Sequence, residues 1–162
     1  MSDEITIYLL SLSLAVGVGY PILVALLYGV QKSISDSFYI DRVGHWFTLY
    51  CWSFPFLTLV AVIEDAPLMF PACVGIMLVG AAAEFRVKHI GVVHYVAAVL
   101  GVTLAFVALM VHYELVVGLG LTAIMVIVTL YYTLLRIPKR VWWIEVWAIL
   151  LIYIGLILNY II

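Results

Sequence analysis

Six long apolar runs dominate the sequence, and short polar turns separate them. The runs cover about residues 5–30, 45–63, 67–85, 90–111, 115–135 and 142–162. A helix needs roughly 20 apolar residues to cross the hydrocarbon core of a bilayer, and each run is close to that length. Because 68% of the residues are hydrophobic and only 10% are charged, a soluble domain is excluded. The sequence predicts an all-α integral membrane protein, a single domain over 1–162 that forms a bundle of six transmembrane helices.

The first run is expected to stay in the protein as a membrane span. It follows Met-Ser-Asp-Glu, which lacks the basic residues of a signal peptide, and it is longer than a signal-peptide core. With six spans, alternate turns lie on opposite sides of the membrane. All seven basic residues then fall on one side, in the first, third and fifth turns: Lys32, Arg42, Arg86, Lys88, Arg136, Lys139 and Arg140.

The opposite side carries acidic residues and no Lys or Arg. The acidic residues lie in the N-terminal segment and in the second and fourth turns: Asp3, Glu4, Glu64, Asp65 and Glu114. By the positive-inside rule, the basic turns are cytoplasmic and both termini lie on the non-cytoplasmic side. The sequence therefore predicts a multi-pass protein of a bacterial cytoplasmic (inner) membrane. All five tryptophans fall in the cytoplasmic halves of the second and sixth spans, as expected for residues at a membrane interface.

Three predicted spans carry a stripe of small residues at helical spacing, and such stripes mark faces where membrane helices approach closely. The stripes are Ala72, Ile76, Gly80 and Glu84; His94, Ala97, Ala98, Gly101 and Ala105; and Glu145, Ala148, Ile152, Gly155 and Asn159. Each stripe has an ionisable residue at its cytoplasmic end, and His45 opens the second span at the same level. We therefore predict a polar cluster of His45, Glu84, His94 and Glu145 at the cytoplasmic end of the bundle.

Two interpretations of this cluster stay open. Ionisable groups close to hydrocarbon are functional candidates, and Glu84 with His94 are the candidates for acid–base catalysis, a proton relay or metal binding. Alternatively, the cluster lies within about one helical turn of the interface and clamps helix ends together. Cys51 and Cys73 lack metal-ligand spacing, and no metal or cofactor is expected. Polar residues deeper in the spans are expected to bond between helices: Ser11, Ser13, Thr58, Thr103, Thr129, Tyr131 and Tyr153.

The first cytoplasmic turn combines hydroxyl groups with basic residues. Ser33 and Ser35, together with Lys32, Arg86 and Lys88, are candidates for binding a phosphate or an anionic lipid headgroup. The alternative is that the serines cap a helix and the basic residues only set the orientation in the membrane.

Ser33-Ile34-Ser35, the aromatic pair Phe38-Tyr39 and an aromatic-rich span after them form a recognisable pattern. With Leu68-Met69-Phe70, Gly80-Ala81-Ala82 and a histidine opening the next span, this pattern resembles an uncharacterised family of small bacterial multi-span membrane proteins. The resemblance covers about residues 31–101. Lys32 stands where that family usually has proline, and the aromatic pair is displaced by one residue. The resemblance implies the multi-span fold and draws attention to the serines and the histidine, but it implies no activity.

The leading hypothesis is a membrane protein that binds or senses a lipid or other amphiphile at the cytoplasmic polar cluster. This hypothesis is preferred to an enzyme. One alternative is an oligomeric channel or proton-linked permease. Another is a small intramembrane hydrolase that uses Glu84 and His94. Membrane lipid is the expected partner and a homo-oligomer is compatible with the small size, whereas the basic residues are explained by topology and indicate no nucleic acid.

Overall fold

The computed structural model describes the backbone of residues 2–41, 43–84 and 90–161, and all of their side chains except those of residues 83, 84, 90 and 91. Six α-helices occupy these residues: α1 (Asp3–Tyr28), α2 (Gly44–Val62), α3 (Met69–Glu84), α4 (Ile90–His112), α5 (Leu115–Leu134) and α6 (Arg140–Asn159). A short 3₁₀ helix, η1 (Ser35–Tyr39), lies between α1 and α2. The predicted all-helical bundle is confirmed, and the predicted helix ends differ from the observed ones by three residues at most.

Five of the helices are long and apolar enough to cross a membrane, and α3 is the shorter exception. Its 16 residues give a length of about 24 Å, less than the roughly 30 Å hydrocarbon core. The helix begins at Met69, because Pro67 stands in the preceding turn. Pro71 fits the first turn of α3, where a backbone N–H has no helical acceptor.

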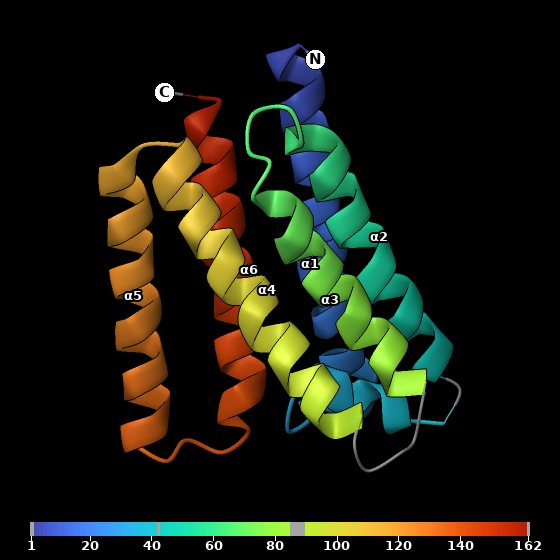
Figure 1. Cartoon of the computed structure of the whole chain (residues 1–162). Coiled ribbons are helices and arrows are strands. Elements are labelled where there is room, and N and C mark those ends of the chain that lie inside the picture. The colour runs from blue at the N-terminus through green and yellow to red at the C-terminus, as the bar shows by residue number, and fades with distance from the viewer. Residues whose placement is uncertain (1, 42, 85–89, 162) are drawn as a thin grey trace.

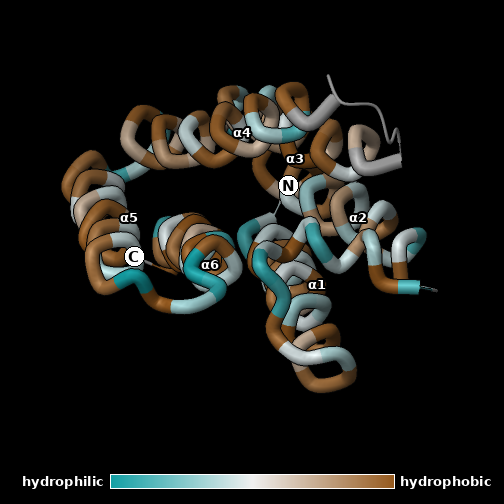
Figure 2. The backbone as a smooth tube through the Cα atoms, turned by 90° about the horizontal axis from the view of Figure 1, so that it is seen from below, coloured by the Kyte–Doolittle hydropathy of each residue, from teal (hydrophilic) through white to brown (hydrophobic). Residues whose placement is uncertain are grey.

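Buried residues from all six helices form the core, and α5 contributes Leu121. Both termini lie at the same end of the bundle (Figure 1). The connections α1–α2 and α5–α6 lie at the opposite end. α5 packs against α4 and α6 at the edge of the bundle (Figures 1 and 2). Only 11% of its most apolar stretch is buried, so the chain leaves a long apolar surface there, as a lipid-facing helix does.

Small residues allow the closest helix contacts. A Cβ built on Gly75 of α3 would lie 3.0 Å from the Cα of Gly101 of α4. On Gly80 it would lie 2.6 Å from the Cβ of Cys51 of α2, and on Gly155 of α6 it would lie 2.8 Å from Leu109 of α4. The small-residue stripes therefore do lie where helices meet, although one stripe can touch different neighbours along its length.

Tyr50 of α2 supplies a hydrogen bond that Pro21 removes from α1. Proline has no backbone N–H, so the carbonyl four residues earlier, that of Gly17, loses its helical donor. The Tyr50 hydroxyl donates to this carbonyl at 3.2 Å. The Tyr50 ring also stacks on Tyr20, with 4.4 Å between the ring centres. The proline position in α1 is thus tied to α2.

The tryptophans divide between surface and core. Trp46 and Trp52 are 63% and 52% exposed, as an interfacial position requires, but Trp142 is only 1% exposed. Trp142 lies in the first turn of α6, and its backbone N–H donates to the carbonyl of Lys32 at 3.2 Å. The prediction of an interfacial position is therefore wrong for Trp142, because the rotation of α6 about its axis turns this side chain inward.

Candidate functional site

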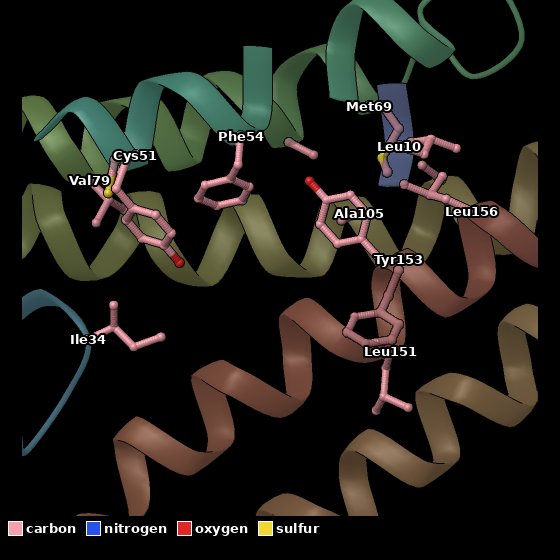
Figure 3. Packing of buried hydrophobic residues seen from close by; sticks show 14 of the residues in the cluster. Leu10, Ile34, Cys51, Phe54, Met69, Val79, Ala105, Leu151, Tyr153 and Leu156 are labelled. Carbon is pink, nitrogen blue, oxygen red and sulfur yellow. The ribbon is translucent and has the colours of Figure 1, made fainter. Parts of the chain in front are cut away.

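An apolar cavity of about 130 Å³ lies between α2, α3, α4 and α6. Figure 3 shows Phe54, Ala105 and Tyr153, which line it, brought together from α2, α4 and α6. Its lining residues on α2 extend from Phe47 to Thr58, a distance of about 16 Å along the helix axis. The cavity is therefore elongated along the bundle, and nearly all of its wall is hydrocarbon, aromatic ring or sulfur.

The predicted small-residue stripes form much of this wall. Each stripe contributes at least two lining residues: Ala72 and Ile76 on α3; Ala98, Gly101 and Ala105 on α4; and Glu145, Ala148 and Ile152 on α6. The wall from α2 consists of larger residues, among them Phe47, Tyr50, Phe54 and Thr58, and sequence reasoning missed it. Their three-and-four spacing is a helical face, but aromatic residues surround this helix on several sides and hide that signal.

One end of the cavity carries a carboxylate. Glu145 lies in the second turn of α6 and is half-buried. Its Oε2 accepts a hydrogen bond from the backbone N–H of Ile34 at 2.5 Å. Ile34 and Ser35 line the cavity beside Glu145. The start of η1 and the residue before it therefore form part of the cavity wall, and the carboxylate bonds to Ile34 there.

The serines around η1 hold this segment in place. The hydroxyls of Ser33 and Ser35 are 2.9 Å apart, and Ser33 Oγ also accepts the backbone N–H of Asp36 at 3.2 Å. The Ser37 hydroxyl donates to the carbonyl of Ile34 at 2.6 Å and lies 2.8 Å from the Tyr20 hydroxyl of α1. Ser33 thus caps the start of η1 locally, as in the alternative that the serines cap a helix. Ser35 also lines the cavity.

A hydroxyl cluster lies further inside the bundle, where Thr58 and Tyr153 line the cavity. The Thr58 and Tyr153 hydroxyls are 2.5 Å apart, and both contact the hydroxyl of Ser13 from α1. The hydroxyls of Ser13 and Thr58 lie 2.5 and 3.0 Å from the carbonyl oxygen of Phe54. The interhelical role predicted for these three residues is confirmed. Only three hydroxyl protons are shared among these five contacts. Hydroxyl lone pairs therefore remain that can accept further hydrogen bonds.

The other predicted hydroxyls divide differently. The Thr129 hydroxyl donates to the carbonyl of Met125 in its own helix, α5, rather than to another helix. Ser11, Thr103 and Tyr131 are exposed. These positions face away from the helix interfaces that hold Ser13.

The two histidines of the predicted polar cluster do not line the cavity. His45 is the second residue of α2 and is exposed. His94 of α4 is half-buried and lies close to the backbone of Val79 in α3. Of the predicted cluster, Glu145 lines the cavity and these two histidines do not.

Three further candidates cannot be placed in this way. Glu84 ends α3, but its side chain lies outside the described residues, and so do Arg86 and Lys88. The exposed Lys32 is the described basic candidate, and its carbonyl accepts the backbone N–H of Trp142 in α6. Within the described ranges, no three His, Cys, Asp or Glu residues are grouped so as to hold a metal ion.

Comparison with known proteins finds no matching family model, curated protein or solved structure. The resemblance of residues 31–101 to small bacterial multi-span proteins stays a prediction.

Proposed function

We propose that this chain is a six-span membrane protein that binds a lipid or other amphiphile, with the hydrocarbon part in the cavity and the polar head at Glu145 and Ser35. In this proposal the shorter helix α3 also crosses the membrane, which makes six spans in all. The turns that carry basic residues face the cytoplasm of a bacterial cell, and both termini face outward. The five long apolar helices and the confinement of Lys and Arg to alternate turns support this orientation.

The observation that carries the proposal is the combination of an apolar cavity with a carboxylate at one end. Ligand pockets are typically apolar, with a few polar groups that fix the orientation of the ligand. An unfilled cavity costs a folded protein about 24 cal/mol per Å³. For the volume of about 130 Å³, about 3 kcal/mol is the upper limit of the gain from filling the space, because the cavity is partly open to its surroundings. The hydroxyls of Thr58 and Tyr153 form hydrogen bonds with each other and with Ser13. They can therefore lie beside an apolar chain without losing these partners.

The described residues favour binding over catalysis or transport. A hydrolase that uses Glu84 and His94 needs the histidine at the substrate, whereas His94 does not line the cavity. A channel or permease needs a polar route, whereas the cavity wall between Glu145 and Thr58 is apolar. No specific observation among the described residues supports these alternatives.

The proposal is tested by filling the cavity. Ala105→Leu and Ala98→Leu each add a branched side chain to its wall on α4. Ala123→Leu, on an exposed position of α5, is the matched control. The full-length protein is purified in detergent micelles, and its binding of 1-octanol is measured by the shift of its thermal unfolding midpoint.

Wild-type protein and Ala123→Leu should show the same stabilisation by octanol, and both cavity variants should lose most of it. If the cavity variants respond to octanol as the wild type does, the ligand lies elsewhere and the proposal is wrong. Because two positions are filled separately, misfolding of one variant leaves the other to decide.

A further inference from the structure

The carboxylate at the end of the cavity is bonded to the backbone through one oxygen atom. Oε2 of Glu145 accepts the backbone N–H of Ile34. A carboxylate can accept about four hydrogen bonds, so this bond leaves Glu145 with further acceptor capacity. Glu145 also lines the cavity.

No cation within the described ranges balances this charge from the cavity wall. None of the lining residues is Lys or Arg, and the nearby side chain of Lys32 is exposed. Among the described residues, Asp36 of η1 is an acid close enough to interact with Glu145. Asp36 also interacts with His94 of α4, which does not line the cavity. The neighbouring Tyr50 and Cys51 of α2 also interact electrostatically with this carboxylate. Both side chains are neutral in their ordinary forms.

Two neighbouring acids attract a cation and repel an anion. A carboxylate beside hydrocarbon is costly unless a positive group pairs with it. A primary ammonium supplies three N–H donors on one atom. Glu145 Oε1 and the lone pairs of the Ser35 hydroxyl, both at this end of the cavity, provide acceptors for such donors.

The volume limits the length of the hydrocarbon part. An apolar cavity of about 150 Å³ binds one benzene molecule, so a volume near 130 Å³ suits an alkyl chain of about six carbons. Phe47 and Phe54 offer aromatic surface along this path. A larger lipid would leave the rest of its chain outside the cavity.

We infer that the ligand is a single-chain primary amine, whose ammonium group pairs with Glu145 and Ser35 and whose alkyl chain lies between α2, α3, α4 and α6. This inference rests on the proposed function and specifies the head group. It replaces the anionic headgroup expected from the basic turns.

The test compares three probes that share one chain: hexylamine, hexanol and hexanoate. Binding to the detergent-solubilised full chain is measured by calorimetry at neutral pH for the wild type, Glu145→Gln and Ser35→Ala. The amide of Glu145→Gln retains an oxygen that can accept the Ile34 N–H, so this variant changes the charge and little else. Hydrogen bonds to charged groups contribute about 1.5–3 kcal/mol, so hexylamine should bind the wild type at least about tenfold more tightly than hexanoate.

In Glu145→Gln the affinity for hexylamine should fall at least about tenfold, while the affinity for hexanol stays unchanged and shows that the cavity is intact. Ser35→Ala should weaken hexylamine binding by a smaller factor. If all three probes bind but hexanoate binds as tightly as hexylamine, the amine inference is overturned and the proposed function survives. If hexylamine binds Glu145→Gln as it binds the wild type, the inference is also overturned. If no probe binds any variant, the proposed function fails with it.

Discussion

Replacing Gly80 by alanine should destabilise the bundle by about 2 kcal/mol, because α2 and α3 touch at this glycine. The new Cβ would lie 2.6 Å from the Cβ of Cys51, and ordinary contacts begin at 3.4 Å, so the helices must separate locally by 3.4 − 2.6 = 0.8 Å. A gap of that size forfeits about a quarter to a half of each contact energy of about 0.1–0.2 kcal/mol. Over the roughly 40 contacts of one buried side chain, the loss is about 2 kcal/mol, which agrees with the range of about 1–3 kcal/mol for overpacked cores.

The assay is the free energy of unfolding in mixed detergent micelles, titrated with SDS and followed by circular dichroism. Second-site changes at Cys51 make the test specific. Cys51→Ala keeps the Cβ that clashes and should not rescue Gly80→Ala, whereas Cys51→Gly removes it. The double-mutant cycle with Cys51→Gly should therefore show a favourable coupling of about 1 kcal/mol or more.

Gly19→Ala is the matched control in α1, because a Cβ at Gly19 meets nothing within 4 Å. It should be neutral or stabilising by about 0.5–1 kcal/mol, as expected when glycine leaves a helix interior. The packing argument is refuted if Gly80→Ala unfolds like the wild type. It is equally refuted if Cys51→Ala rescues as well as Cys51→Gly does.

Three further predictions concern single side chains. Tyr50→Phe should cost about 1–3 kcal/mol, because the Gly17 carbonyl loses its donor, and adding Pro21→Ala should recover part of this loss in the same SDS titration by restoring a helical N–H. Trp142→Ala should cost about 3–5 kcal/mol, because this side chain is fully buried; a loss below about 1 kcal/mol would contradict its placement in the core. Burial raises the pKa of Tyr160, just beyond the end of α6, above its ordinary value of 10.0. The folded protein therefore keeps the proton where the unfolded chain loses it, so the stability from this group is full below the ordinary pKa and falls as the pH rises above it. Tyr160→Phe should flatten the alkaline loss of stability in a thermal unfolding series, and an unchanged alkaline limb would count against this assignment.

Several features of this protein follow from local sequence alone. The length and apolarity of a run decide whether it forms a helix long enough for a membrane, and a polar turn ends it, so the predicted and observed helix ends nearly coincide. The small-residue stripes could also be predicted. Helical spacing places Ala98, Gly101 and Ala105 on one face, whichever helix lies beside it.

The sequence was less informative where the rotation or the partner of a helix matters. Glu145 was recognisable as an ionisable residue at the end of a stripe, but its partner is the backbone N–H of Ile34. Every residue except proline carries such a group, so nothing in the side-chain pattern singles out Ile34. In the same way, a tryptophan near a helix end suits either an interface or a core, and only the packing of α6 buries Trp142.

The sequence by itself thus determined the apolar all-helical class, the six helices and the separation of basic residues into alternate turns, because hydropathy and chain length act within each segment. The tertiary structure decided the cavity, since its wall is assembled from four helices that are distant in the chain. It also placed Glu145 on the cavity wall but not His45 or His94, which the sequence had grouped with it by their level in the bundle. Level follows from counting residues, whereas contact depends on how each helix is turned and which helices are neighbours.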